Sequence, residues 1–100
     1  MSESNAFVWL CDQVETITNL SRLEARGTVR IALKELGLLP ADLAPLQAAK
    51  VAEHVLPREL ATRGVDDAAA ICQRLAVEAK NIPDDRSGSA ADEIFRELTS

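Results

Sequence analysis

The chain has 100 residues, of which 47% are hydrophobic and only 3% aromatic, and its formal net charge is −5 at pH 7. This length suits a single domain, and with no tyrosine its core must be built from aliphatic side chains. The negative charge argues against broad electrostatic binding to nucleic acid or to an anionic membrane, because both require a positive field on the protein.

The first segment predicts an amphipathic helix. Phe7, Leu10, Val14 and Ile17 recur at intervals of three and four residues, which places them on one helix face. Ser4 is expected to cap this helix by accepting a hydrogen bond from a backbone N–H of the first turn.

The segment from Ser21 to Gly37 carries both a start and a stop signal for a helix. Ser21 and Glu24 form a capping box, in which each side chain accepts a hydrogen bond from the other residue's backbone N–H. Gly37 can adopt the left-handed conformation that ends many helices, and Leu38 would then fold back on Leu33. At about 100° per residue, the core-facing arc is expected to hold five residues. These are Ala25, Val29, Ala32, Leu33 and Leu36.

Two prolines delimit the middle of the chain. Pro45 suits the first turn of a third helix, where no backbone N–H is needed. Its apolar side chains are Leu46, Ala49, Val51 and Val55. Pro57 would remove a hydrogen bond inside this run, so the helix is expected to kink or to break there. A short helix over about residues 57–63 would follow, with Gly64 as its stop.

The next helix shows the most regular apolar series, and Asp66 is expected to cap it. The series consists of Ala68, Ile71, Cys72, Leu75, Ala76 and Ala79, and Asn81 and Pro83 end it. The sequence then turns polar. Residues 1–82 are therefore predicted to form a helical domain, and residues 83–100 a polar linker with a short C-terminal amphipathic helix. Ser89 would cap that last helix, and its apolar side chains are Ile94, Phe95 and Leu98.

These segments together predict an all-α fold: a compact bundle of four to five short helices with a flexible C-terminal segment. Two widely separated cysteines, no signal peptide and no apolar run long enough to cross a membrane indicate a cytoplasmic location.

No catalytic, metal-binding or cofactor-binding residues are predicted, and the chain is not expected to be an enzyme. His54 is the only histidine and has no Ser/His/Asp or Cys/His arrangement around it, so it is interpreted as a helix-surface or packing residue. Cys11 and Cys72 fall on apolar helix faces, where each is expected to act as a small buried hydrophobic residue. A disulfide between them is the alternative.

Four basic residues of the second helix form a basic ridge, which consists of Arg22, Arg26, Arg30 and Lys34. Three interpretations remain open. The side chains can border the core and reach into water, pairing with acidic neighbours such as Asp12, Glu15 or Glu59. The ridge can bind an acidic protein or peptide, with Gly27 allowing close approach. The third interpretation is phosphate contact in a helix-turn-helix-like nucleic-acid-binding regulator.

Trp9 and Ile31 are predicted to point away from the core arcs of their helices, unless other helices cover them. Trp and Arg are favoured residues at protein interfaces. The preferred function is therefore a non-catalytic adaptor or regulatory domain. Its predicted partner is another protein, for which an acidic protein is one option, or a second copy of itself. The predicted contact residues are Trp9, Ile31, the basic ridge, and the terminal Ile94, Phe95 and Leu98. Nucleic acid is the less favoured partner, and no membrane is expected.

Overall fold

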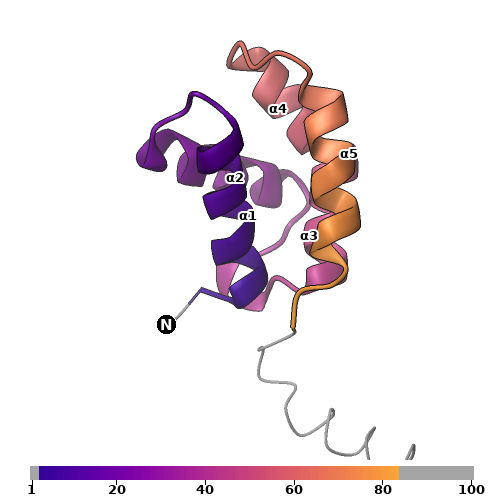
Figure 1. Ribbon diagram of the computed structural model, residues 1–100. Helices are drawn as coiled ribbons and strands as arrows, with labels where there is room; N and C mark the ends of the chain where they lie inside the picture. Colours follow the sequence, from indigo (N-terminus) through magenta and orange to yellow (C-terminus); the bar gives the residue numbers. More distant parts are fainter. Residues whose placement is uncertain (1–2, 84–100) are drawn as a thin grey trace, which may run out of the picture.

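The computed structural model describes residues 3–83, which form five α-helices, one short 3₁₀ helix and connecting loops, without a strand (Figure 1). The all-α prediction is confirmed. The predicted terminal helix, with Ser89, Ile94, Phe95 and Leu98, lies outside the described residues. The helices are α1 (Asn5–Ile17), α2 (Arg22–Glu35), α3 (Pro45–His54), α4 (Leu56–Thr62) and α5 (Ala68–Ala79), and the 3₁₀ helix η1 (Pro40–Asp42) joins α2 to α3.

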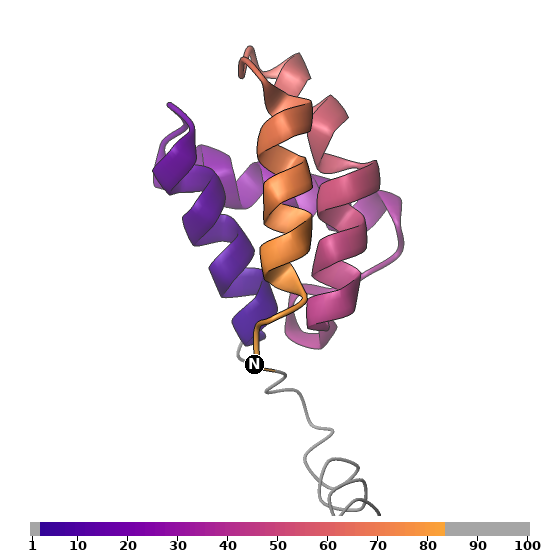
Figure 2. The same ribbon diagram turned by 45° about the vertical axis from the view of Figure 1, so that its right-hand side comes forward.

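Three helices stand side by side, with α5 between α1 and α3, and α2 crosses behind them (Figure 2). The start of α1 and the end of α5 lie at the same end of the bundle in both views (Figures 1 and 2). The turn from α1 to α2 and the turn from α4 to α5 lie at the opposite end. None of the helices in the described part of the chain has the length and apolarity needed to cross a membrane.

One aliphatic core fills the space between the helices, and most of the predicted apolar faces point into it. Two predicted core positions are wrong, because Ile17 is 37% exposed and Leu36 is 45% exposed. Leu46, one of the apolar residues of the third predicted helix, is 64% exposed. Each lies in the first or last turn of its helix or just beyond it, where no neighbouring helix covers the side chain.

The predicted start signals of the first two helices are confirmed. The Ser4 hydroxyl accepts a hydrogen bond from the Phe7 N–H at 3.1 Å. At the start of α2, the Ser21 N–H donates to Glu24 Oε1 at 2.9 Å, and the Glu24 N–H donates to Ser21 Oγ at 3.2 Å. This capping box satisfies two backbone donors that the helix leaves unpaired.

Glycine ends both α2 and α4 in the same way. Gly37 has φ +69° and donates to the Lys34 carbonyl, and the Leu38 N–H donates to the Leu33 carbonyl at 2.9 Å, as predicted. At the end of α4, Gly64 has φ +82° and the Val65 N–H donates to the Leu60 carbonyl at 3.0 Å. Both are Schellman motifs, in which the left-handed residue turns the chain back over its own helix.

The alternatives at Pro57 are resolved in favour of a break. α3 ends at His54, and α4 begins at Leu56 with Pro57 in its first turn, where its missing N–H costs nothing. The prediction that Asp66 caps the last helix is wrong. Asp67 occupies the cap position, in the left-handed conformation and without a side-chain capping bond. Aspartate tolerates this conformation better than most residues, so the sharp turn after Gly64 can continue directly into α5.

Cys11 and Cys72 are free, buried thiols, as predicted. Burial raises the pKa of Cys11 to about 12 and that of Cys72 to about 11. At pH 8 we expect neither thiol of the folded protein to react with a disulfide reagent, whereas both should react in denaturant. Because the thiols keep their protons longer when folded, stability should be constant below the unfolded pKa and fall as the pH rises through 9–12. Rapid native reaction of either thiol would contradict this expectation.

Candidate partner-binding surface

The outer face of α2 carries an apolar stripe that no other described element covers. Leu23, Gly27 and Ile31 follow one another at intervals of four residues, on the side of the helix opposite its core arc. Leu23 is 80% exposed and Ile31 is 43% exposed. We call these three residues the α2 stripe.

Gly27 lies near the middle of this 14-residue helix, and nothing within the described part of the chain explains why it is a glycine. No described atom lies within 4 Å of the position that a Cβ would occupy. Glycine inside a helix costs about 1 kcal/mol relative to alanine. Its effect here is to leave a flat place on the stripe, where another backbone can approach closely.

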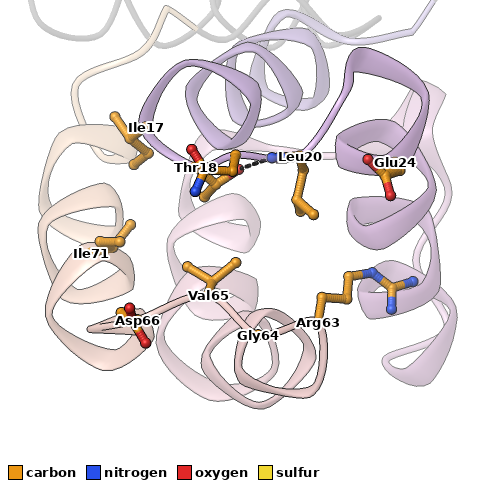
Figure 3. Close-up of a pocket in the computed structure, with 10 residues that line it drawn as sticks. Ile17, Thr18, Leu20, Glu24, Arg63, Gly64, Val65, Asp66 and Ile71 are labelled. Carbon is orange, nitrogen blue, oxygen red and sulfur yellow. Dashed lines mark hydrogen bonds between the residues drawn. The ribbon is translucent and has the colours of Figure 1, made fainter.

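A shallow groove of about 390 Å³ runs beside the stripe and is lined by Leu20, Glu24, Gly27 and Arg63. Three of these residues also line an open cavity of about 350 Å³ at the end of the bundle, between the α1–α2 turn and the α4–α5 turn (Figure 3). Figure 3 shows the side chains of Leu20 and Val65 directed into this cavity. The groove therefore extends the apolar surface beyond α2 itself, whereas half of the residues that line the cavity are polar or charged. The apolar lining of the cavity consists of Ile17, Leu20, Val65 and Ile71.

Arg63 is held at the mouth of the groove by a buried residue of α2. Its Nε donates a hydrogen bond to Thr28 Oγ1, and the Thr28 hydroxyl donates to the Glu24 carbonyl at 2.7 Å. Thr28 is fully buried, and the hydrogen bond that it accepts from Arg63 is partly buried. The guanidinium forms no ion pair within residues 3–83 and remains exposed. Hydrogen bonds from Ser21, and to a smaller extent the charge of Arg63, lower the pKa of Glu24.

Two members of the basic ridge are already paired within the domain. Arg26 and Arg30 both donate to the Glu3 carboxylate, Arg30 at 2.8 Å, and their guanidinium carbons lie 5.5 and 5.6 Å from the centroid of the Phe7 ring. The hydrogen bond from Arg26 is the largest cause that lowers the pKa of Glu3. Arg22 and Lys34 are exposed, and neither forms an ion pair with a described carboxylate. The ridge thus does not pair with the acidic neighbours named from the sequence.

Trp9 lies apart from the α2 stripe. It is half-buried against the core and lines a third cavity, of about 360 Å³, together with residues from the end of α5. The predicted contact residues Ile31, Arg30 and Lys34 all lie on α2. Trp9 lies on α1, and its cavity is at the C-terminal end of α5, whereas the 350 Å³ cavity is at the other end of the bundle. The residues beside Trp9 in its cavity are Glu78, Asn81, Ile82 and Pro83.

The charges that border the α2 stripe are mainly positive, although the whole chain is acidic. Glu35 is paired with Arg58 at 2.7 Å, and Glu24 is next to Arg63. Six cations stand against four carboxylates, which leaves an excess of two positive charges. The cations are Arg22, Arg26, Arg30, Lys34, Arg58 and Arg63, and the carboxylates are Glu3, Asp12, Glu24 and Glu35.

Other chemistry has less support in the described part of the chain. His54 lies at the exposed end of α3 with its Nε2 3.6 Å from the Glu53 carboxylate, so it is a helix-surface residue. Within residues 3–83, no group of three or more His, Cys, Asp or Glu side chains is arranged to hold a metal ion. No protein-family model, curated protein or solved structure matches this chain significantly.

Proposed function

We propose that this chain is a small, non-catalytic cytoplasmic interaction domain that binds an acidic, amphipathic protein helix on the α2 stripe. The helix would belong to another protein or to a second copy of this chain. The stripe supplies apolar contact area, and the surrounding excess of positive charge attracts and orients an acidic ligand. An amphipathic helix in an apolar groove is a recurring mode of protein recognition.

The observation that carries the proposal is Gly27. Within the domain it lowers helix stability, and a Cβ at this position would meet no described atom within 4 Å. An apolar side chain stands one turn before it and another one turn after it, both exposed. A glycine between two exposed apolar residues is the arrangement that close helix approach requires, because a Cβ would hold the partner away.

Substitutions at Gly27 should change stability and binding in opposite directions. Gly27→Ala should raise the free energy of unfolding by about 0.5–1 kcal/mol, because the site has room for a methyl group and alanine favours the helix. The same change should weaken partner binding, and Gly27→Leu should weaken it further by filling the groove. Denaturant unfolding and binding measured on the same samples would check this. A stabilised Gly27→Ala protein with unchanged binding would place the partner elsewhere.

The binding measurement itself uses a matched pair of variants of the full chain. Leu23→Gln removes an exposed leucine from the stripe, and Leu46→Gln removes a comparably exposed leucine on α3. Size exclusion with light scattering at low and high salt reports self-association, and affinity capture from native lysate reports other partners. We expect association that Leu23→Gln abolishes and Leu46→Gln leaves intact. Identical behaviour of the wild type and Leu23→Gln in both measurements would refute the proposal.

The α2 surface does not favour the alternative function, binding of nucleic acid. Two of the four ridge cations are engaged by Glu3, and the outward face of α2 presents apolar residues rather than the polar side chains that read base edges.

A further inference from the structure

We infer that the α2 stripe is covered, in the free protein, by this chain's own C-terminal segment, residues 84–100. The inference rests on the proposed function, since it names one occupant for the same surface. The segment lies outside the described residues, and the described chain ends at Pro83.

The sequence of the segment is that of an acidic amphipathic helix. Ala91, Ile94, Phe95 and Leu98 are spaced at three, four and seven residues from the first, which is the pattern of one helix face. The segment contains five acidic and two basic residues, so it carries three of the five net negative charges of the whole chain. These are the two properties that the α2 surface selects: an apolar face and a negative charge.

The two apolar faces also match in size. On both helices an apolar-face residue follows every three or four positions, and four residues of a helix rise by about 6 Å. When Phe95, the largest apolar residue of the segment, is set over Gly27, Ala91 and Leu98 fall one turn to either side, opposite Ile31 and Leu23. A large side chain then meets the flat place that Gly27 leaves, which is how packed helices interlock.

The charges are complementary in the same register. The charged groups around the stripe sum to an excess of two positive charges, and the segment has a net charge of −3. Arg22 and Lys34, the ridge cations without a described ion pair, are free to meet the acidic side chains. An interaction of this kind between exposed charges weakens with added salt.

The segment is long enough to reach the ridge from the end of α5. Pro83, the last described residue, lines the same cavity as Trp9 of α1. On α1, the ring of Phe7 lies 5.5 and 5.6 Å from the guanidinium carbons of Arg26 and Arg30. α1 lies between Pro83 and this side of the ridge, and the α2 stripe lies on the outer face of α2 beyond it. Each helix with its side chains is about 10–12 Å wide. Residues 84–90 can span up to about 23 Å.

A tethered occupant would set the threshold for outside partners. A segment joined to the domain by a short linker acts at a millimolar effective concentration, so an external helix must displace it. Phe95→Asp places a charge on the apolar face of the segment. We therefore expect it to increase the capture of those partners whose binding is lost in Leu23→Gln.

The direct test places a nitroxide on the segment of the full chain. A cysteine introduced by Thr99→Cys can be labelled selectively, because the two native thiols are buried and their pKa values are raised. We expect loss of NMR signal intensity for the backbone amides of residues 23–34, reversed when the nitroxide is reduced. Phe95→Asp should restore these signals, and the control Arg96→Ala, on the opposite side of the segment's helix, should not. Unaffected α2 amides would overturn the inference.

Two further outcomes separate the possible failures. In a mixture of isotope-labelled chain and nitroxide-bearing unlabelled chain, broadening of α2 would mean that the segment binds a second copy, which overturns coverage within one molecule. Unaffected α2 amides in a protein whose partner capture still depends on Leu23 would reject the segment and leave the proposed function standing. If Leu23→Gln changes neither capture nor association, the proposed function itself fails.

Discussion

Replacing Phe7 by alanine should lower the free energy of unfolding by about 3–5 kcal/mol, the range for a large buried aromatic side chain. Phe7 is fully buried, and its ring also supports the guanidinium groups of Arg26 and Arg30. The substitution therefore leaves a core cavity and removes the platform that holds the Glu3 pairs in place. Denaturant unfolding at pH 7 measures the loss.

Phe7→Leu serves as the matched control, because it retains most of the apolar contact but has no aromatic face. Its loss should be smaller, while the pairs to Glu3 should weaken. Since Arg26 lowers the pKa of Glu3, the carboxylate contributes stability above its ordinary pKa, and that contribution is lost as the pH falls through the folded value. In Phe7→Leu this acid-dependent part should shrink. A Phe7→Ala protein as stable as the wild type would contradict the assigned packing.

Replacing Leu60 by alanine should cost about 2–5 kcal/mol, again as a cavity in the core. Leu60 is fully buried on the seven-residue α4, and its carbonyl accepts the Val65 N–H of the Schellman motif. Such a short helix has little stability of its own, so its position depends on this packing. We expect the α4–α5 turn to lose protection from hydrogen exchange before the rest of the domain.

Leu46→Ala is the control for Leu60, because it removes the same atoms from a side chain that is 64% exposed. The expected change is within about 0.5 kcal/mol. Equal losses for the two variants would show that burial does not govern these positions.

The helices were predictable from sequence because their signals are local. Ser21 with Glu24, and Gly37 with Leu38, act over three to five residues, so a linear reading finds them. The sequence could not predict whether the helix kinks or breaks at Pro57, because both outcomes satisfy the same local rules. Ile17 and Leu36 were misplaced because the helical period does not say where a neighbouring helix ends.

The candidate surface was only partly predictable for a related reason. The outward direction of Ile31 and the accessibility of Gly27 follow from the helical wheel, and the exposure of Leu23 follows in the same way. Glu3 pairs with arginines 23 and 27 residues away, and Arg63 reaches Thr28 across 35 residues. Contacts at that separation depend on how α1, α2 and α4 pack, which no spacing within one helix encodes.

The position of Trp9 makes it a natural optical probe of one end of the bundle. The chain has a single tryptophan and no tyrosine, so its near-ultraviolet emission arises almost entirely from this one indole. Trp9 lines a cavity together with Ile82 and Pro83, where the chain leaves α5. A change in emission wavelength therefore reports the surroundings of that exit, and circular dichroism reports the helices as a whole. If the emission changes at a lower denaturant concentration than the circular dichroism, the end of α5 separates from α1 before the bundle unfolds.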